Sequence, residues 1–167
     1  MTFWKQWKAT GALPPKPAKK TVLLAALGGF IAIAVLALLA QQSGALLILG
    51  SFGASCVIVF GFIESPFAQP RNVIVGHFLS SLTGLVFLNV FGAQWWSMAL
   101  AVAVAIAAMM ITRTVHPPAG SNPVIVMLAQ PGWQFLLTPT LLGAVGIVLV
   151  ALVYNNYPKG RQYPKYW

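Results

Sequence analysis

The chain has 167 residues, of which 59% are hydrophobic and only 7% are charged. Soluble domains need charged side chains over much of their surface, so this composition excludes them and predicts an integral membrane protein. The formal net charge is +9, but eight of the ten Lys and Arg residues lie in two tails, 1–20 and 156–167. Basic residues beside apolar segments set topology and bind lipid headgroups. Because no basic helix face carries interleaved aromatic residues, we expect no nucleic-acid partner.

Three regions follow one another along the chain. Residues 1–20 combine Trp and Lys with a Pro-rich link, which predicts a cytoplasmic interfacial tail. Residues 21–155 are the predicted transmembrane domain, and 156–167 form a basic, aromatic C-terminal tail.

The transmembrane domain is predicted to be an all-α bundle of about five membrane-spanning helices plus one short broken or re-entrant helix. About 20 residues, at ~1.5 Å each, cross a hydrocarbon core of ~30 Å. Residues 119–130 are too few to cross, so they are predicted to form the short element. The full spans are expected at 21–41, 44–63, 73–91, 98–111 and 135–154.

The distribution of positive charge predicts orientation. Both tails are basic, and so are the loops that hold Arg71 and Arg113, whereas the turns at 41–44 and 92–97 carry no positive charge. The positive-inside rule therefore places both termini in the cytoplasm, and we expect a bacterial inner (plasma) membrane.

A weak internal repeat links two polar breaks in the apolar sequence, "ESPFAQPRN" (64–72) and "RTVHPPAGSN" (113–122). Offset by 51 residues, "SPFAQPRNVIV" aligns with "HPPAGSNPVIV", matching a Pro, an Ala and the VIV triplet. Internal symmetry is common in transporters, so a two-fold repeat is possible, and chance similarity of apolar sequence is the alternative.

The ionisable side chains of the membrane domain, apart from Cys and Tyr, gather at these breaks. They are Glu64, Arg71, His77, Arg113 and His116. A charge at membrane depth costs a few kcal/mol, so such groups pair with one another or line a watery cavity. We predict a structural ion pair between Glu64 and Arg113, with Arg71 as the other possible partner.

Pro66, Pro117 and Pro123 each suit the first turn of a helix and disfavour helical geometry in the preceding residue. Ser65 and Asn122 are good N-cap types, so two helix starts are expected here. The unpaired N–H groups of a helix start attract anions. We therefore predict an anion site without a fixed negative charge.

The candidate substrate-binding residues are the polar and helix-breaking residues of both breaks and the small hydroxyl residues of the second apolar segment. They are His116, Pro117, Pro118, Gly120, Ser121, Asn122, Arg71, Asn72, His77, Ser51 and Ser55. Alternatives remain for several. His77 and His116 are also compatible with purely structural roles, and Ser51 and Ser55 with close helix packing.

The motifs "GSFGAS", "ESPFAQPRNVIVGH" and "HPPAGSNP" resemble those of the HPP family of small integral membrane proteins. The resemblance covers residues 50–123. It implies a transporter with four transmembrane helices, and nitrite transport is associated with plastid and cyanobacterial members.

The favoured function is a transporter or channel for a small monovalent anion such as nitrite. A non-transporting scaffold or accessory subunit is the alternative. An enzyme is not expected, since the chain has one acidic residue and no evident nucleophile beside a base. No cofactor or metal is expected. Glycine pairs at 28–29 and at 143 and 146 suggest subunit contacts, so we predict a homo-oligomer, most simply a dimer.

Overall fold

The computed structural model describes residues 11–167, and this part of the chain is helical without strands. Its main helices are α1 (Lys19–Ser43), α2 (Gly50–Gly61), α3 (Pro70–Phe91), α4 (Trp95–Ile111), α5 (Asn122–Ala129) and α6 (Leu142–Asn156). Four short elements connect them: η2 (Pro66–Ala68), η3 (Pro117–Ser121), η4 (Trp133–Leu136) and the π-helical η5 (Leu137–Leu141). The aromatic residues of the predicted N-terminal tail, Trp4 and Trp7, lie outside the described residues.

Among the described residues, three helical stretches are long and apolar enough to cross a membrane: Lys19–Ser43, Pro70–Phe91 and Trp133–Asn156. The predicted five full spans are therefore not confirmed. The segment predicted at 44–63 is helical only over Gly50–Gly61, because Gly44 ends α1 in the left-handed conformation and Leu49 is extended. The non-helical stretch packs closely against α6, where a side chain at Gly143 would collide with the Leu47 carbonyl.

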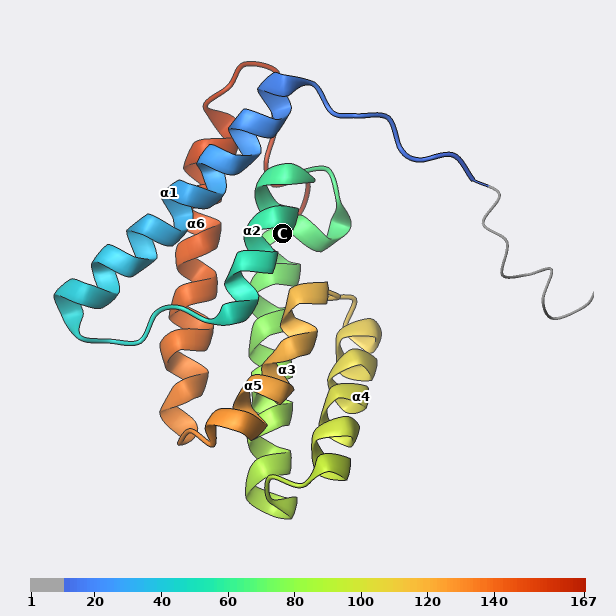
Figure 1. Cartoon of the computed structure of the whole chain (residues 1–167), viewed down its shortest axis with the longest axis vertical. Coiled ribbons are helices and arrows are strands. Elements are labelled where there is room, and N and C mark those ends of the chain that lie inside the picture. Colours follow the sequence, from blue (N-terminus) through green and yellow to red (C-terminus); the bar gives the residue numbers. More distant parts are fainter. Residues whose placement is uncertain (1–10) are drawn as a thin grey trace, which may run out of the picture.

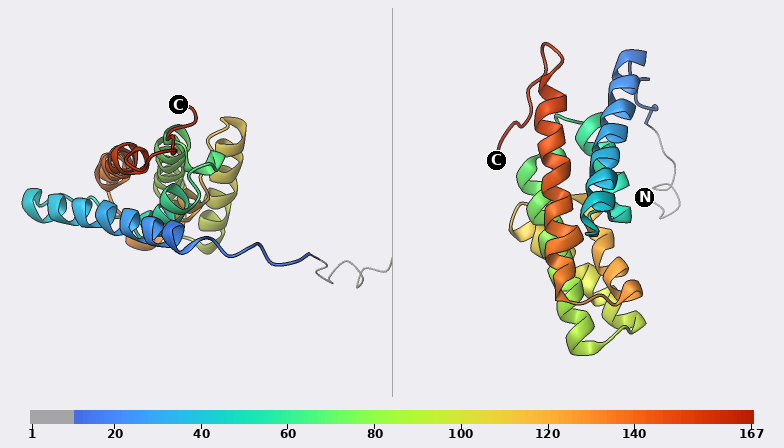
Figure 2. Two further views of the ribbon diagram at one scale, coloured as in Figure 1. Left: turned by 90° about the horizontal axis from the view of Figure 1, so that it is seen from above. Right: turned by 90° about the vertical axis from the view of Figure 1, so that its left-hand side faces the viewer.

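Helix α3 lies at the centre of the arrangement and packs against α4 and α5, while α1 packs against α2 and α6 (Figure 1). Figure 2 shows α1 and α6 running beside each other on one side of the molecule. Only 17% of the most apolar 18-residue stretch of α1 is buried, so this helix presents most of its surface outward. Large apolar side chains are exposed on the outer helices, including Phe30, Ile111 and Val153, as expected for contact with lipid.

Three of the four glycines that we expected at subunit contacts, Gly28, Gly143 and Gly146, pack inside the chain instead, whereas a side chain on the half-buried Gly29 would lie 3.6 Å from the Cys56 Cβ. A side chain on Gly28 would collide with Phe60 and Tyr154, and one on Gly146 would collide with Leu36. Gly143 likewise lies against Phe52. These glycines let α1, α2 and α6 approach one another closely, so they give no support to an oligomer.

Both polar breaks contain a proline-led 3₁₀ turn. The turn η3 continues directly into α5, whereas the extended Gln69 separates η2 from α3, which begins at a proline of its own, Pro70. Ser65 caps the first, since its Oγ accepts from the Phe67 N–H at 3.2 Å. The prediction that Asn122 caps the second is wrong: Asn122 is helical, with φ −62° and ψ −40°, and its side chain points elsewhere. Helix α5 is short because Gln130 turns left-handed ahead of Pro131. The local shapes agree only in their proline-led turns, and the two-fold repeat is not confirmed.

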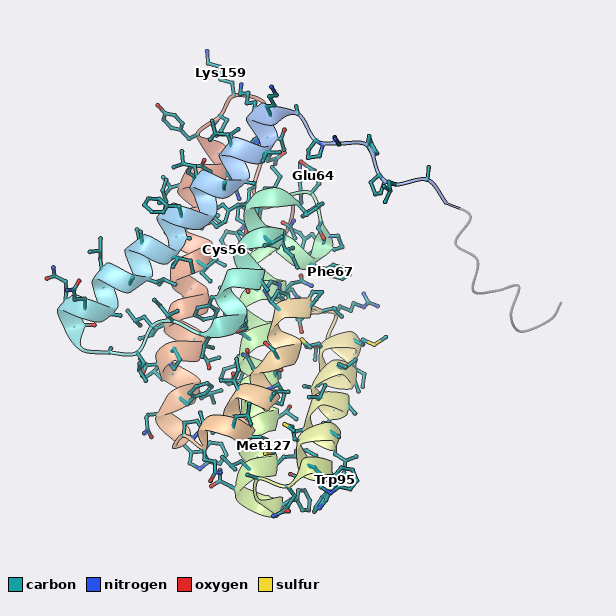
Figure 3. All side chains as sticks on the ribbon, in the orientation of Figure 1. Cys56, Glu64, Phe67, Trp95, Met127 and Lys159 are labelled. Carbon is teal, nitrogen blue, oxygen red and sulfur yellow. The ribbon has the colours of Figure 1, made fainter. Side chains whose placement is uncertain are left out.

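The two ends of the bundle differ in chemistry. Lys159 and Glu64 lie at one end of the molecule, and Trp95 lies at the opposite end (Figure 3). Phe67, in the first break, lies on the same half as Glu64. Basic groups at one end and a tryptophan at the other suit a bundle that sits across a bilayer.

Candidate functional site

A buried serine joins two buried histidines at the centre of the bundle. The Oγ of Ser55 on α2 lies 2.9 Å from Nε2 of His77 on α3 and 2.8 Å from Nε2 of His116, the residue before η3. All three residues have no exposed surface. The imidazole centroids are 5.0 Å apart. We call these three side chains the His–Ser–His cluster.

The hydrogen bonds continue from His77 into α5 and the start of the last helix. Asn122 Nδ2 lies 3.0 Å from His77 Nδ1 and donates to Ser81 Oγ at 2.8 Å. The Ser81 hydroxyl is in turn 3.0 Å from Thr140 Oγ1. Asn122, Ser81 and Thr140 are fully buried. Polar groups from α2, α3, α5 and η5 are thus linked through one network.

The partners at each end define the hydrogen positions on the two rings. Asn122 Nδ2 is a donor, so His77 Nδ1 accepts and its Nε2 carries the proton that is donated to Ser55. At the other end, the carbonyl of Phe67 is an acceptor 2.7 Å from His116 Nδ1, so that nitrogen carries the proton. Ser55 has a single hydroxyl proton, and we assign it to His116 Nε2 at 2.8 Å rather than to the more distant Ser51 carbonyl at 3.2 Å, so that the bonds between the rings run in one direction.

Gly76 and two side-chain-to-backbone hydrogen bonds hold the second polar break, residues 113–122, against α3. A side chain on Gly76 would lie 2.9 Å from the His116 Cβ and 2.9 Å from the Thr114 carbonyl oxygen. Asn72 Nδ2 donates to the Val115 carbonyl at 2.9 Å, and Ser80 Oγ donates to the Ala119 carbonyl at 2.6 Å. The small residue at 76 and these two bonds therefore fix the position of the His116 ring.

The structure brings together some of the predicted site residues and separates others. His116, His77, Ser55 and Asn122 meet in the network, and the Ser51 carbonyl lies 3.2 Å from Ser55 Oγ as a second possible acceptor of its proton. Pro118 is buried beside them and Gly120 is partly buried. Asn72 holds the break from α3. The remaining predicted residues, Arg71, Pro117 and Ser121, are exposed.

The predicted ion pair between Glu64 and Arg113 is wrong. The Glu64 carboxylate is 3.0 Å from Lys165 Nζ in the C-terminal tail. Arg113 is exposed at the end of α4, with a left-handed φ of 57°. Arg71 donates to the Thr112 carbonyl at 3.0 Å. Because Glu64 is itself largely exposed, it makes its pair in solvent beside the tail and leaves both arginines without an acidic partner among the described residues.

The predicted unpaired amides are not found at the starts of the two proline-led turns, η2 and η3. Pro117 and Pro118 have no N–H, and the Ala119 N–H donates to the His116 carbonyl at 2.9 Å. In the other break, the Phe67 N–H is satisfied by Ser65. At these two turns the polar character of the site comes from side chains rather than from backbone donors.

Ser80, Ser81, Thr140 and the Phe67 carbonyl are parts of the site that the sequence analysis missed. Ser80 and Ser81 follow His77 by one helical turn, a spacing that places a side chain on the same face. Thr140 follows a break at Thr138, whose φ of −125° and ψ of 122° are not helical. The Thr138-Pro139 dipeptide was the available signal, since a residue before proline avoids helical geometry.

The C-terminal tail covers the first break. Tyr163 Oη donates to the Ala68 carbonyl at 2.8 Å, and Tyr166 Oη donates to Asn72 Oδ1 at 3.1 Å. The Lys165 N–H donates to Gln69 Oε1 at 2.7 Å. Tyr163 is 2% exposed, and burial raises the pKa of its phenol. We call residues 161–166 the C-terminal strap.

The chemistry of the site is neutral and polar. Within residues 11–167, no three His, Cys, Asp or Glu side chains come together as metal ligands. Two side-chain atoms near the cluster are buried without a hydrogen-bond partner, Ser51 Oγ and Asn122 Oδ1. The arrangement can donate and accept hydrogen bonds and can exchange protons through imidazole and hydroxyl groups.

The fold and the site together define an all-helical integral membrane protein with a polar centre. The chain belongs to the HPP family, whose transmembrane region matches residues 14–164. One transmembrane protein of Dictyostelium discoideum is 40% identical over 181 residues, covering 99% of this chain and 63% of its own length. A second from the same organism is 36% identical over 179 residues, covering 99% and 57%. No solved structure matches the chain.

This chain therefore spans about three fifths of the length of the curated relatives that it matches. Their names describe them only as transmembrane proteins.

Proposed function

We propose that the chain transports a small monovalent anion such as nitrite across a membrane, and that the His–Ser–His cluster binds the anion. The observation that carries this proposal is the burial of Ser55, His77, His116 and Asn122 where the two helix breaks meet α2 and α3. Burying polar side chains in a bilayer is costly, and such groups commonly mark a solute path.

The charges around the cluster favour an anion over a cation. All the hydrogen bonds to the two imidazoles come from Ser55, Asn122 and the Phe67 carbonyl, and none comes from a carboxylate. Arg71 and Arg113 lie at the exposed ends of α3 and α4. An anion approaching the break meets a positive potential, and inside the bundle it meets N–H and O–H donors.

The closed network indicates how the anion would be held. Ser55 donates to one ring and accepts from the other, so an anion that displaces this hydroxyl takes over the His77 Nε2–H as a donor. The Asn122 amide supplies further donors beside it. Exchange of one set of hydrogen bonds for another keeps the buried groups satisfied, which lowers the cost of loading and release.

The membrane topology is part of the proposal. Two basic tails on the cytoplasmic side require an even number of crossings, so α1, α3 and Trp133–Asn156 cross together with residues 44–61, which contain α2, and the short α5 ends inside the bilayer. The curated relatives come from Dictyostelium discoideum, so a bacterial membrane remains a prediction.

Uptake of nitrite into proteoliposomes tests the function. The purified protein should accumulate nitrite faster than empty vesicles, and His116→Ala should abolish most of that difference. Ser97→Ala is the matched control, because Ser97 is also fully buried but lies on α4 outside the network. If the wild-type protein moves neither nitrite, nitrate nor formate above empty vesicles, the proposal fails.

A scaffold or accessory role is the second candidate, and the satisfied state of the network favours it. Nearly every polar atom of the cluster already has a partner inside the chain, as a purely structural network would require. Extraction in a mild detergent discriminates the two: a stable complex with a different membrane protein, together with no uptake by the purified chain, supports the scaffold.

A homodimer remains a proposal. An apolar groove of about 710 Å³ between α1 and α2 is lined by small residues that include Gly29, Gly53 and Ala25. Small side chains allow close helix contact in lipid, so a second copy could pack here. Native mass spectrometry from detergent should show the mass of two chains.

A further inference from the structure

We infer that Ser55, His77 and His116 form a proton relay while the cluster is closed, and that the anion which then displaces the serine moves together with one relayed proton. The relay gives the proposed transporter its coupling ion and rests on that function for its role. Proton movement itself is measured separately. The inference starts from the unbroken sequence of short hydrogen bonds between the two rings.

The distances allow direct proton transfer between neighbours. His77 Nε2 and Ser55 Oγ are 2.9 Å apart, and Ser55 Oγ and His116 Nε2 are 2.8 Å apart. Both lie within the range in which a positioned acid and base exchange a proton. The hydroxyl accepts on one side and donates on the other, so it can pass a proton on without ever holding a charge.

The protons balance in a single concerted step. The step begins with an extra proton on His77 Nδ1, which makes that ring an imidazolium. His77 Nε2 then gives its proton to Ser55 Oγ while the Ser55 hydroxyl proton passes to His116 Nε2. His77 is left neutral with a proton on Nδ1, and His116 becomes the imidazolium. One positive charge has moved from the first ring to the second, and Ser55 is again a neutral hydroxyl.

Asn122 has the group that the charged state of His77 requires. In the resting network its Nδ2 faces His77 Nδ1 at 3.0 Å, while its Oδ1 is buried without a partner. A half-turn of the amide exchanges the two atoms, and Oδ1 then accepts from the protonated Nδ1. An unpaired buried oxygen is costly in a structure, so its presence beside a titratable ring supports a second state in which it is used.

The surroundings let the relay hold no more than one extra proton. The rings are 5.0 Å apart at their centroids, so two imidazolium ions would repel each other strongly away from water. On the elements packed against them, the partners are the Ser55 hydroxyl, the Asn122 amide and the Phe67 carbonyl. Phe52 meets the His77 ring edge to face at 5.0 Å. A bound anion would neutralise the single extra charge.

Arg113 is exposed at the end of α4, and three other charged or titratable groups near this part of the fold are engaged elsewhere. Arg71 donates to the Thr112 carbonyl, and Tyr163 donates to the Ala68 carbonyl. Glu64 pairs with Lys165. No carboxylate among the described residues bonds to either ring, so the anion itself is the partner available for an imidazolium in the cluster.

Two measurements in the same proteoliposomes test the relay: nitrite uptake, and lumenal pH reported by a trapped dye, each corrected for empty vesicles. The wild-type protein should carry one proton with each nitrite. Ser55→Ala keeps both rings but removes the link, so its proton flux should fall by about tenfold or more. Ser97→Ala should behave as wild type. If Ser55→Ala does not fold, His116→Gln replaces it in this test, because glutamine keeps a hydrogen-bonding group but cannot carry the charge.

The outcomes separate the relay from the transport proposal. Nitrite uptake without accompanying protons, or full proton coupling in both Ser55→Ala and His116→Gln, overturns the relay and leaves anion transport standing. If wild-type vesicles take up no nitrite, anion transport fails, and a potassium diffusion potential set with valinomycin then tests the relay alone. Proton entry that exceeds empty vesicles and is lost in Ser55→Ala supports it, whereas entry equal to that of empty vesicles overturns it.

Discussion

Ser55 and His116 are 61 positions apart in the chain, yet the serine Oγ and the histidine Nε2 are joined by a 2.8 Å hydrogen bond with both residues fully buried. This contact ties the half-length helix α2 to the break before η3. It places a hydroxyl between the only two histidines of the chain.

Replacing His116 should impair both stability and transport. His116→Ala leaves the Ser55 hydroxyl and the Phe67 carbonyl without their partner, and unsatisfied buried groups cost about 1–3 kcal/mol each. We expect a lower thermal unfolding midpoint in detergent, and His116→Gln should recover part of it. If His116→Ala keeps wild-type uptake kinetics, the ring has a structural role alone.

Gly76 should be intolerant of any side chain. A methyl group there meets the His116 Cβ and the Thr114 carbonyl at 2.9 Å, so Gly76→Ala must displace the break and should cost about 1–3 kcal/mol. Gly53→Ala is the control, because nothing lies within 4 Å of that position. Thermal unfolding and nitrite uptake of the two variants measure the difference. If the two variants unfold at the same temperature and take up nitrite equally, Gly76 on α3 does not fix the position of His116.

Because of Tyr163 in the C-terminal strap, the folded protein should become less stable as the pH becomes alkaline. Burial raises the pKa of the Tyr163 phenol in the folded state, so its contribution is fully present below the unfolded pKa of about 10 and is lost as the pH rises above it. The unfolding midpoint should therefore fall above about pH 10, and Tyr163→Phe should fall less steeply. Parallel curves for the two proteins would contradict this account.

The ion pair between Glu64 and Lys165 should contribute little. Both side chains are substantially exposed, and pairs of this kind are worth about 0–1 kcal/mol. Glu64→Gln should leave the unfolding midpoint and nitrite uptake close to wild type. A large loss of uptake in this variant would instead place the sole acidic residue of the chain on the solute path.

Topology can be read with single cysteines in a Cys56→Ser background. Lys159→Cys and Gln94→Cys lie at opposite ends of the proposed bundle, so an impermeant thiol reagent should label them from opposite faces of the membrane. If both cysteines are labelled from the same face, the proposed topology is wrong.

The sequence predicted the helical class, the two breaks and four members of the network, because apolar length and proline position act locally. It did not predict the length of α2. Residues 45–49 are apolar enough to belong to a span, but they are not helical, and the Leu47 carbonyl packs against Gly143 of the distant helix α6. Tertiary contact of this kind leaves no local pattern.

The errors at the site have the same origin. The pairing of Glu64 with Lys165 joins residues about 100 positions apart, and the sequence offered two nearer arginines as partners. Asn122 has a good capping side chain, but its amide bonds to His77 and Ser81 on α3 instead. Ser55 was a predicted site residue. Its contacts with both imidazole rings were not predicted, because they depend on the packing of α2 against η3.

Nitrogen-15 NMR of protein labelled at histidine tests the central claim most directly, because the chain contains two histidines. At neutral pH we predict two neutral rings of opposite tautomer, with the proton on Nδ1 in His116 and on Nε2 in His77, and nitrite should shift the signals of both. Identical tautomers that do not respond to nitrite would contradict the directed His–Ser–His cluster and its role in binding the anion.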